Sequence, residues 1–272
     1  MAEPGAKLWA DRTFLREVQY QTDVNLAARQ SIYAYQHPQV NLMSQVLDLA
    51  GPADHEVVAD IGCGNGLYLA ELARHGHTGP ILGVDMSPGM LRATRQRAKD
   101  AGSAGPALLA ADATALPLRD AATDLTLAMH MLYHVSEPGR AVAELRRVTR
   151  PGGRVIVGLN GNDHLQEMRA VVTAALASIG HGPWPRVGAL VDLDQGETLV
   201  RSVFTSVTRH DFVSKLLLPG PEPVVDYVRS MSEAKYVAEP ELLIPALTDR
   251  LPGCCDGAVF EVTTHSGCLI CA

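Results

Sequence analysis

The stretch that decides the fold is Glu56-Val-Val-Ala-Asp-Ile-Gly-Cys-Gly-Asn-Gly66. It opens with an apolar run, Val57 to Ala59, of the kind that forms a buried strand of a parallel sheet. Asp60 closes the run, and the chain from Leu67 onward predicts a helix, so the intervening loop ends at a helix N-terminus with free N–H groups. Three glycines stand at alternate positions in that loop: Gly62, Gly64 and Gly66. Such glycines permit a sharp turn and a close approach of a ligand to the backbone, so the stretch predicts a nucleotide site.

The glycine spacing argues against a dinucleotide. Dinucleotide-binding loops use Gly-x-Gly-x-x-Gly, and the position of the third glycine is occupied here by Leu67. A phosphate loop ending in Gly-Lys-Ser/Thr is also missing. The carboxylate of Asp60 would repel a pyrophosphate and suits a ligand that carries an ammonium group.

Three stretches together indicate a family. Val58–Gly66 resembles motif I of the class I S-adenosylmethionine (SAM) dependent methyltransferases, Met129–Val135 resembles their "LHHV" segment, and Leu145–Arg154 resembles their "RVLRPGG" stretch. The resemblance covers about residues 55–160 and is nearest to the type 11 and ubiquinone-biosynthesis-like enzymes. It implies a Rossmann-like, seven-stranded α/β sheet with helices on both faces and an N-terminal helical lid. It also implies SAM as cofactor and S-adenosylhomocysteine (SAH) as product.

The alternation of apolar strands and amphipathic helices predicts a parallel, doubly wound sheet between residues 57 and 160. The expected strands cover 57–60, 81–85, 107–112, 124–130 and 154–160, and the expected helices 67–73, 88–101, 138–149 and 163–179. After Gly180 the regularity fails, and His181–Pro185 is expected to be a loop that faces the substrate. The later expected elements are strands at 206–218 and 258–271 and helices at 221–231 and 240–250. In the resembled family such a tail supplies the last two strands, with a substrate-shaping insertion, here around 181–255.

The residues before the glycine loop are expected to be helical, over 8–20, 24–35 and 40–49, with Asp23 capping the second helix. Their aromatic side chains can pack these helices against the main domain. Alternatively, as the resemblance implies, Tyr20, Tyr33 and Arg29 belong to a lid over cofactor and substrate. We therefore divide the chain into a helical lid at 1–50 and a SAM-binding domain at 51–272.

Acids at the ends of the second and third strands complete the predicted cofactor site, because ligands of open α/β sheets bind at the carboxyl ends of the strands. Asp85 can accept hydrogen bonds from both ribose hydroxyls of a nucleoside, and Asp112, with Ala113 behind it, from an adenine amino group. Their alternative roles are a helix N-cap and a solvated turn acid. The expected cofactor-binding residues are Asp60, Gly62, Cys63, Gly64, Gly66, Asp85, Met86, Asp112, Ala113 and His130.

The loop after the fourth strand supplies the candidate for proton transfer. Methyl transfer from SAM depends mostly on positioning the acceptor, and a general base helps when the acceptor carries a proton. His134 is the candidate base because histidine titrates near neutral pH; alternatively it only shapes the loop through hydrogen bonds. Tyr20, Tyr33 and Tyr133 are expected beside the acceptor, and Asn160 and His164, after the fifth strand, are further candidates for the pocket.

Composition and net charge limit the classes of molecule with which the protein is expected to interact. The 272 residues are 47% hydrophobic and 19% charged, which fits a folded globular protein. A net charge of -7 without a basic cluster argues against nucleic acid. No apolar run approaches the length of about 20 residues that spans a bilayer, and no secretory signal is visible. We therefore expect a cytoplasmic protein that acts on a small molecule, contacts no membrane and can form a homodimer.

The five cysteines do not predict a disulfide framework, because their number is odd and no signal precedes them. Cys268 and Cys271 could join Cys254 and Cys255 in a zinc site. However, residues three apart on a strand point to opposite faces, which favours buried free thiols and no metal.

The function expected from these observations is transfer of a methyl group from SAM to an oxygen, nitrogen or carbon nucleophile of a metabolite. The Ala/Gly/Arg-rich, lysine-poor composition favours a metabolite of specialised metabolism. The alternative is a SAM-binding regulator or pseudoenzyme without transferase activity. An NAD-dependent oxidoreductase is disfavoured by Leu67 and Asp60. A nucleic-acid methyltransferase is disfavoured by the acidic balance and by the lack of an Asn/Asp-Pro-Pro-Tyr/Phe sequence after the fourth strand.

Overall fold

A computed structural model describes residues 10–102, 105–184, 191–231, 239–251 and 259–272. These residues form a sheet of eight strands in the order β1-β7-β8-β6-β5-β2-β3-β4. Its parallel strands are β2 (Val58–Ile61), β3 (Ile81–Asp85), β4 (Ala107–Ala110), β5 (Thr123–Met129) and β6 (Thr149–Asn160). The long strands β7 (Val207–Leu218) and β8 (Phe260–Cys271) pair antiparallel, and β8 also pairs antiparallel with β6.

The predicted α/β sheet is confirmed, although it holds one strand more than the seven expected. The additional strand is β1 (Gln36–His37), which pairs antiparallel with Leu216 and Lys215 of β7. A strand of two residues has no alternation that a sequence pattern could reveal. Among the strand limits that differ from the prediction, β4 ends at Ala110, before Asp112, and β6 begins at Thr149 rather than at Arg154.

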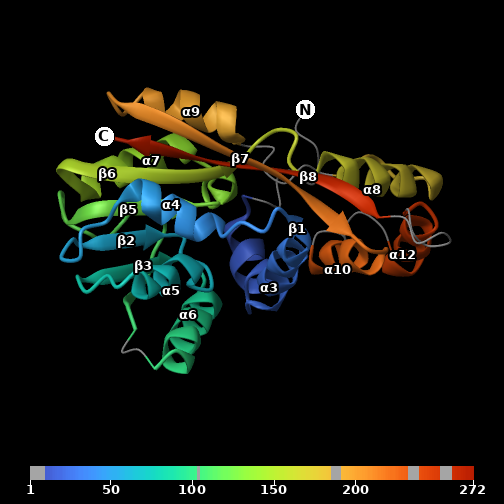
Figure 1. Cartoon of the computed structure of the whole chain (residues 1–272), viewed down its shortest axis with the longest axis horizontal. Coiled ribbons are helices and arrows are strands. Elements are labelled where there is room, and N and C mark those ends of the chain that lie inside the picture. Colours follow the sequence, from blue (N-terminus) through green and yellow to red (C-terminus); the bar gives the residue numbers. More distant parts are fainter. Residues whose placement is uncertain (1–9, 103–104, 185–190, 232–238, 252–258) are drawn as a thin grey trace.

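Helices cover both faces of the sheet (Figure 1). One face carries α4 (Leu42–Ala50), α5 (Leu67–Arg74) and α6 (Pro88–Asp100), and the other α7 (Pro138–Val148) and α9 (Leu193–Arg201). The strands alternate between the two cores: Val58 and Ile156 pack on the α4–α5 face, and Ala59 and Val157 on the α7–α9 face. The burial of both faces explains why these strands are continuously apolar.

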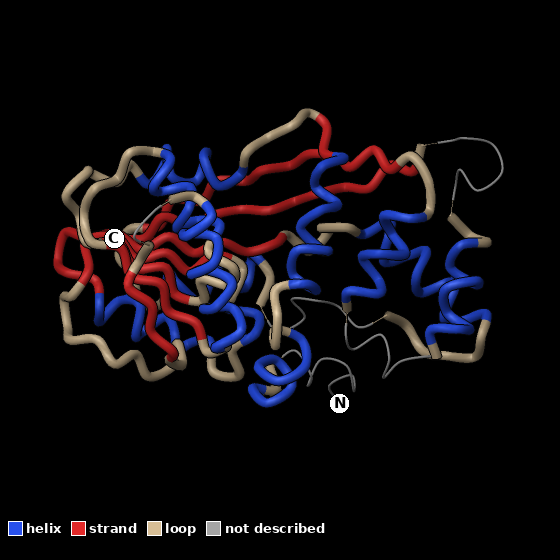
Figure 2. The backbone as a smooth tube through the Cα atoms, turned by 90° about the horizontal axis from the view of Figure 1, so that it is seen from below, coloured by secondary structure: helices blue, strands red, loops and turns tan. Residues whose placement is uncertain are grey.

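A third core lies where β7 and β8 extend past the parallel strands (Figure 1). It contains α8 (Gln166–Ser178), α10 (Glu222–Ser230) and α12 (Pro240–Thr248). These helices pack around Leu216, Leu218 and Val262, which are fully buried. Figure 2 shows the parallel strands gathered at one end of the molecule and this helical group at the other.

The N-terminal segment, residues 10–41, bridges the two ends. It contains α2 (Arg12–Phe14), a π-helical turn (Leu15–Gln19), α3 (Val24–Ser31) and a 3-10 turn (Ile32–Tyr35). Ile32 enters the third core, while Leu26 lies over the glycine loop, 3.3 Å from where a Cβ of Gly64 would be. The helical prediction for this segment is correct within the described residues, but the side chain of Asp23 forms no capping hydrogen bond with α3.

The C-terminal strand bears out the prediction of buried thiols. Cys268 and Cys271 are free and fully buried, and they pack on opposite faces of the sheet. Burial raises the pKa of each thiol to about 12. Cys254 and Cys255 lie outside the described residues.

Candidate active site

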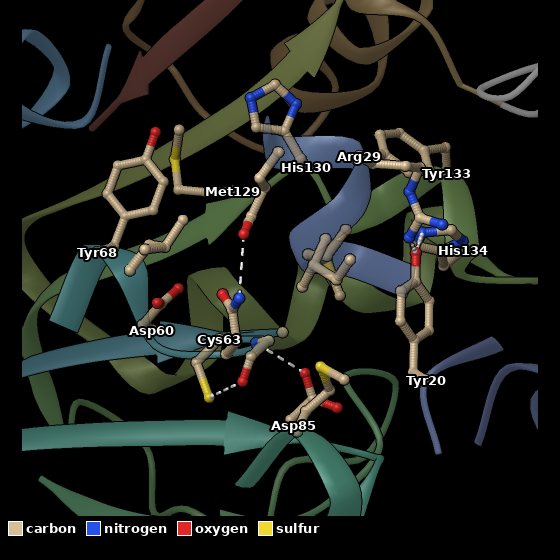
Figure 3. Close-up of a pocket in the computed structure, with 18 of the residues that line it drawn as sticks. Tyr20, Arg29, Asp60, Cys63, Tyr68, Asp85, Met129, His130, Tyr133 and His134 are labelled. Atoms are coloured by element: carbon tan, nitrogen blue, oxygen red, sulfur yellow. Dashed lines mark hydrogen bonds between the residues drawn. The ribbon is translucent and has the colours of Figure 1, made fainter. Parts of the chain in front are cut away.

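A cavity of about 540 Å³ opens at the carboxyl ends of the parallel strands and is covered by the N-terminal segment (Figure 3). Every predicted acceptor-side residue lines it, and so does every predicted cofactor-binding residue except Gly66. The topology brings these residues together because the ends of parallel strands meet at one edge of a sheet.

The glycines of the loop have two different functions. Gly62 has a φ of 75°, and a Cβ there would lie 2.7 Å from the Met131 Cβ, so only glycine lets the loop lie against this region of the cavity wall. Gly66 also has a positive φ, but a Cβ there would meet Thr94 Cγ2 of α6 at 2.7 Å. Gly66 therefore lets the loop pack against α6. It was predicted to bind the cofactor, but it does not line the cavity.

Asp85 ties the glycine loop to the end of β3. Its Oδ2 accepts a hydrogen bond from the Gly64 N–H at 2.9 Å, and its Oδ1 accepts one from the Ser87 N–H at 2.8 Å. Burial raises the pKa of the Asp85 carboxyl. The helix N-cap of α6 is Ser87 and not Asp85. The side chain of Asp85 instead lies at the cavity wall, as does Met86.

Asp60, Tyr68 and Thr264 each bring to the cavity wall a buried polar atom without a hydrogen-bond partner among the described residues. Asp60 is 1% exposed, and the atom without a partner is its Oδ1. Burial, with a further contribution from Asp85, raises the pKa of its carboxyl to about 7. The hydroxyl of Tyr68, a wall residue that the sequence analysis missed, is likewise buried without a partner in the described chain. Buried polar atoms are normally paired, so these atoms indicate a polar ligand.

Asp112 is held from outside the sheet. It lies two residues past β4, and its Oδ2 forms an ion pair with Arg12 Nη2 at 2.6 Å. Its Oδ1 accepts hydrogen bonds from the N–H and the hydroxyl of Thr114, both at 2.8 Å. The prediction that Asp112 ends the third parallel strand is thus wrong. Any ligand amino group there shares the carboxylate with Arg12, while Ala113 lines the wall next to it.

Two further predicted cofactor residues are uncharged at neutral pH. His130 follows β5 with a φ of 54°, and its N–H donates to the Gly158 carbonyl at 2.9 Å. Burial lowers the pKa of its imidazole to about 4. Burial raises the pKa of the Cys63 thiol, which stays protonated.

His134 is joined to the N-terminal segment (Figure 3). Its Nε2 lies 2.9 Å from the Tyr20 hydroxyl, and its ring packs edge-on against Tyr133 with the centroids 4.6 Å apart. Arg29 Nη2 donates to the same Tyr20 hydroxyl at 3.2 Å, and Arg29 Nη1 donates to the Ser230 carbonyl of α10 at 3.1 Å. The cluster therefore joins three regions of the chain that the sequence analysis treated separately.

Tyr33 and His164 form a second pair on the cavity wall. His164 Nδ1 accepts a hydrogen bond from the His265 backbone N–H at 3.0 Å. Burial lowers the pKa of His164 to about 3, so its single proton is on Nε2, which donates to the Tyr33 hydroxyl at 3.1 Å. The Tyr33 hydroxyl thus accepts this bond and keeps its own proton to donate. Asn160, also on the wall, accepts from the Ser266 hydroxyl at 3.0 Å.

Three other observations delimit the site. The loop that begins at His181 does not line the cavity, since Trp184 packs into the third core; Pro185 lies outside the described residues. No group of three or more His, Cys, Asp or Glu side chains in the described ranges could hold a metal ion. Across those same ranges, no helix has the length and apolarity to cross a membrane.

Comparison of the sequence with known proteins identifies a domain family and several methyltransferases that are similar to this chain. A methyltransferase domain model matches residues 59–157. The malonyl-[acyl-carrier protein] O-methyltransferase of Geobacter sulfurreducens is 32% identical over 182 residues, which cover 65% of this chain and 67% of that protein. The demethylmenaquinone methyltransferase of Renibacterium salmoninarum is 33% identical over 131 residues, 48% of this chain and 52% of that protein. The chain spans about a third to a half of the length of the first two curated relatives that it matches.

Among solved structures, the phosphoethanolamine N-methyltransferase 2 of Haemonchus contortus, in complex with phosphomonomethylethanolamine and SAH, has a TM-score of 0.58. It is 17% identical, and the match covers 97% of this chain and 59% of that protein. At this identity the likeness shows a shared fold.

Proposed function

Since this chain belongs to the SAM-dependent methyltransferases, we propose that it transfers the methyl group of SAM to an oxygen, nitrogen or carbon nucleophile of a small-molecule acceptor. The observation that carries the proposal is one continuous cavity. It joins a glycine loop and an unpartnered acid to a cluster of histidine and tyrosine side chains. When bound, SAM supplies an electrophilic methyl group on a sulfonium, and the chain must then orient the acceptor and exclude water.

The residues present fit this cofactor. The buried Asp60 Oδ1 without a partner suits the ammonium of the methionine moiety, and Gly62 and Gly64 line the cavity with backbone alone. Asp85 retains lone pairs for two ribose hydroxyls beside the bonds that it accepts from Gly64 and Ser87. We assign Asp112 and Ala113 to the adenine, with Met86, Cys63 and His130 completing the wall.

His134 is the proposed base on the acceptor side. When the acceptor is a hydroxyl or an ammonium, a proton must leave as the methyl group arrives, and an imidazole can take it at neutral pH. The contact of His134 Nε2 with the Tyr20 hydroxyl provides a hydrogen-bonded route for that proton. Tyr33 and Tyr133 orient the acceptor, and the N-terminal segment serves as the lid.

The cavity size favours a small acceptor. A volume of about 540 Å³ lies within the range of small-ligand sites. We propose a metabolite of specialised metabolism as the acceptor, bound between the lid at 1–50 and the insertion at 181–255 of the SAM-binding domain.

The first test is calorimetric titration of the purified chain with SAH, with NADH as the control. We expect SAH to bind with a Kd of about 1 μM, roughly 8 kcal/mol, and NADH not to bind. Labelled SAM with a panel of acceptors then measures transfer. Failure of SAH to bind contradicts the proposed cofactor.

His134 is tested by replacement with alanine. We expect His134→Ala to lower turnover by about 10²-fold or more and to leave the SAH affinity unchanged, because a base acts on the acceptor. His181→Ala is the control, since His181 is exposed and does not line the cavity. Equal turnover of the two variants would leave His134 with a packing role only.

A further inference from the structure

We propose that the acceptor is a small organic acid whose carboxylate is bound by Arg29. This inference rests on the proposed methyl transfer and adds the chemical class of the acceptor.

The charged lining residues separate into two groups. Asp60, Asp85 and Asp112 all lie around the glycine loop and the strand ends, and Arg12 is paired with Asp112. Arg29 is the remaining permanently charged residue among the described residues that line the cavity. Figure 3 shows it grouped with Tyr20, Tyr133 and His134, away from Asp60 and Asp85. The acceptor side therefore carries one positive charge and, among its described residues, no carboxylate.

The Arg29 guanidinium has donors left for a ligand. Of its five N–H groups, one donates to the Tyr20 hydroxyl at 3.2 Å and one to the Ser230 carbonyl at 3.1 Å. Both partners are uncharged, and Arg29 forms no ion pair with any residue that the structure describes. It is partly buried, and its Cζ lies 5.5 Å from the centroid of the Tyr20 ring. A partly desolvated cation without a counterion is costly, and a carboxylate supplies that counterion through parallel hydrogen bonds.

The neighbouring side chains add further donors. Burial raises the pKa of both Tyr33 and Tyr133, so each keeps its hydroxyl proton at neutral pH. The Tyr33 hydroxyl already accepts a bond from His164, which leaves its proton free to be donated to a ligand oxygen. An acceptor rich in ammonium groups would be repelled by Arg29 and find no carboxylate there among the described residues. A single arginine with hydroxyl donors matches the single charge of a carboxylate.

The test compares acids with their own amides. The chain is first saturated with SAH, and the affinity measured in that step reports on the proposed cofactor alone. The saturated chain is then titrated calorimetrically with four acids, benzoate, 4-hydroxybenzoate, salicylate and phenylacetate, and with the four matching amides. We expect at least one acid to bind about tenfold more tightly than its amide. Arg29→Gln should bring the ratio close to one while the SAH affinity stays within about twofold.

Two variants keep this test decisive. Arg16→Gln removes an equal charge from an exposed position of the N-terminal segment that does not line the cavity, and it should keep the preference for the acid. Arg29 also ties α3 to α10 through Ser230, so a second variant, Arg29→Lys, is needed. This variant keeps the positive charge but loses the planar guanidinium. It should weaken the preference for the acid over the amide without abolishing it. The proposal is overturned if SAH binds but no acid binds at millimolar concentration. It is equally overturned if acid and amide bind alike, or if the preference survives Arg29→Gln or is unchanged in Arg29→Lys.

Discussion

Asp60 is a carboxyl group that titrates in the pH range in which most enzymes work. Burial among apolar strands disfavours its charged form and raises its pKa to about 7, and one of its oxygens lacks a partner in the described chain. Its charge therefore depends both on the pH and on whether a cation lies beside it. An ammonium-bearing ligand favours the ionised form, so binding and deprotonation of Asp60 are linked.

This linkage predicts a pH-dependent affinity for SAH. Below a pKa of about 7 the ligand binds only after Asp60 has lost its proton, so the affinity should rise about tenfold between pH 6 and pH 8 and then level off. Calorimetry across this range measures the effect. Asp60→Asn should bind SAH more weakly and without the pH step, and a flat profile for the unmodified chain would contradict the assignment of Asp60 to the ammonium.

At the residue scale, the sequence reveals those site residues that belong to a local pattern. Asp60 and the glycines form a contiguous loop, and Asp85 ends a predicted strand. The family resemblance places Arg29 in a lid, but its contacts with Tyr20 and with Ser230, the latter 201 positions away, arise from tertiary packing. The ion pair between Arg12 and Asp112 and the unpartnered hydroxyl of Tyr68 are likewise products of tertiary packing, which no local pattern encodes.

At the scale of elements, the junction between the N-terminal segment and α6 depends on Gly89. A Cβ at Gly89 would lie 2.0 Å from the Gln21 carbonyl oxygen, and the adjacent Ser87 hydroxyl donates to the Tyr20 carbonyl at 2.7 Å. The chain can lie this close to the start of α6 only when residue 89 has no side chain. Tyr20, whose carbonyl makes this contact, is also the residue whose hydroxyl lies 2.9 Å from His134 Nε2.

Gly89→Ala should therefore displace the N-terminal segment without unfolding the sheet. We expect faster hydrogen exchange of the backbone amides of residues 12–31 and a weaker affinity for SAH. Gly139→Ala is a matched control, because Gly139 also follows the first proline of a helix and its Cβ would meet nothing nearer than Leu199 Cδ1 at 3.7 Å. That control should be neutral or more stable by up to about 1 kcal/mol. Equal exchange in both variants would show that Gly89 does not hold the segment.

Elements with clear periodicity were predicted well, and the two that were missed have physical reasons. Helix α9 lies in a stretch that follows loop-like sequence, although its N-terminus has a capping box in which Asp192 Oδ1 accepts from the Gln195 N–H at 2.9 Å. This Asp-x-x-Gln pattern is the sequence signal for the start of α9. Strand β1 forms only because β7, about 180 residues later, offers a free edge.

At the scale of the whole molecule, His265 links three regions of the fold. Its Nδ1 lies 2.6 Å from Asp163 Oδ1 in the loop after β6, and its Nε2 lies 2.8 Å from Asp211 Oδ1 of β7. Burial lowers the pKa of His265, but the hydrogen bonds to Asp211 and Asp163 raise it by more, so the folded-state pKa is higher than the ordinary value. With a carboxylate at each nitrogen, the charged imidazolium is favoured.

The sign of the pH dependence follows from that shift. The stabilisation by His265 is fully present below the unfolded-state pKa of about 6.5 and is lost as the pH rises through the higher folded-state value. Urea unfolding of the unmodified chain and of His265→Gln should therefore give a difference in unfolding free energy that shrinks from pH 6 to pH 9. We expect a change of at most about 1 kcal/mol, because both carboxylates are more than a third exposed. His181→Gln serves as the exposed control, and a difference that is constant or grows with pH would contradict the assignment.

The acceptor side of the cavity is built partly by Tyr133 and His134 and partly by segments that flank residues 59–157, and these flanks bear on how such proteins diversify. The glycine loop, Asp85 and Asp112 lie within residues 59–157, whereas Tyr20, Arg29, Tyr33 and Tyr227 lie outside that range. After gene duplication, substitutions in the flanking segments can thus exchange one acceptor for another while the inherited donor machinery stays intact. Laboratory evolution toward new acceptors can for the same reason begin with libraries in those flanks.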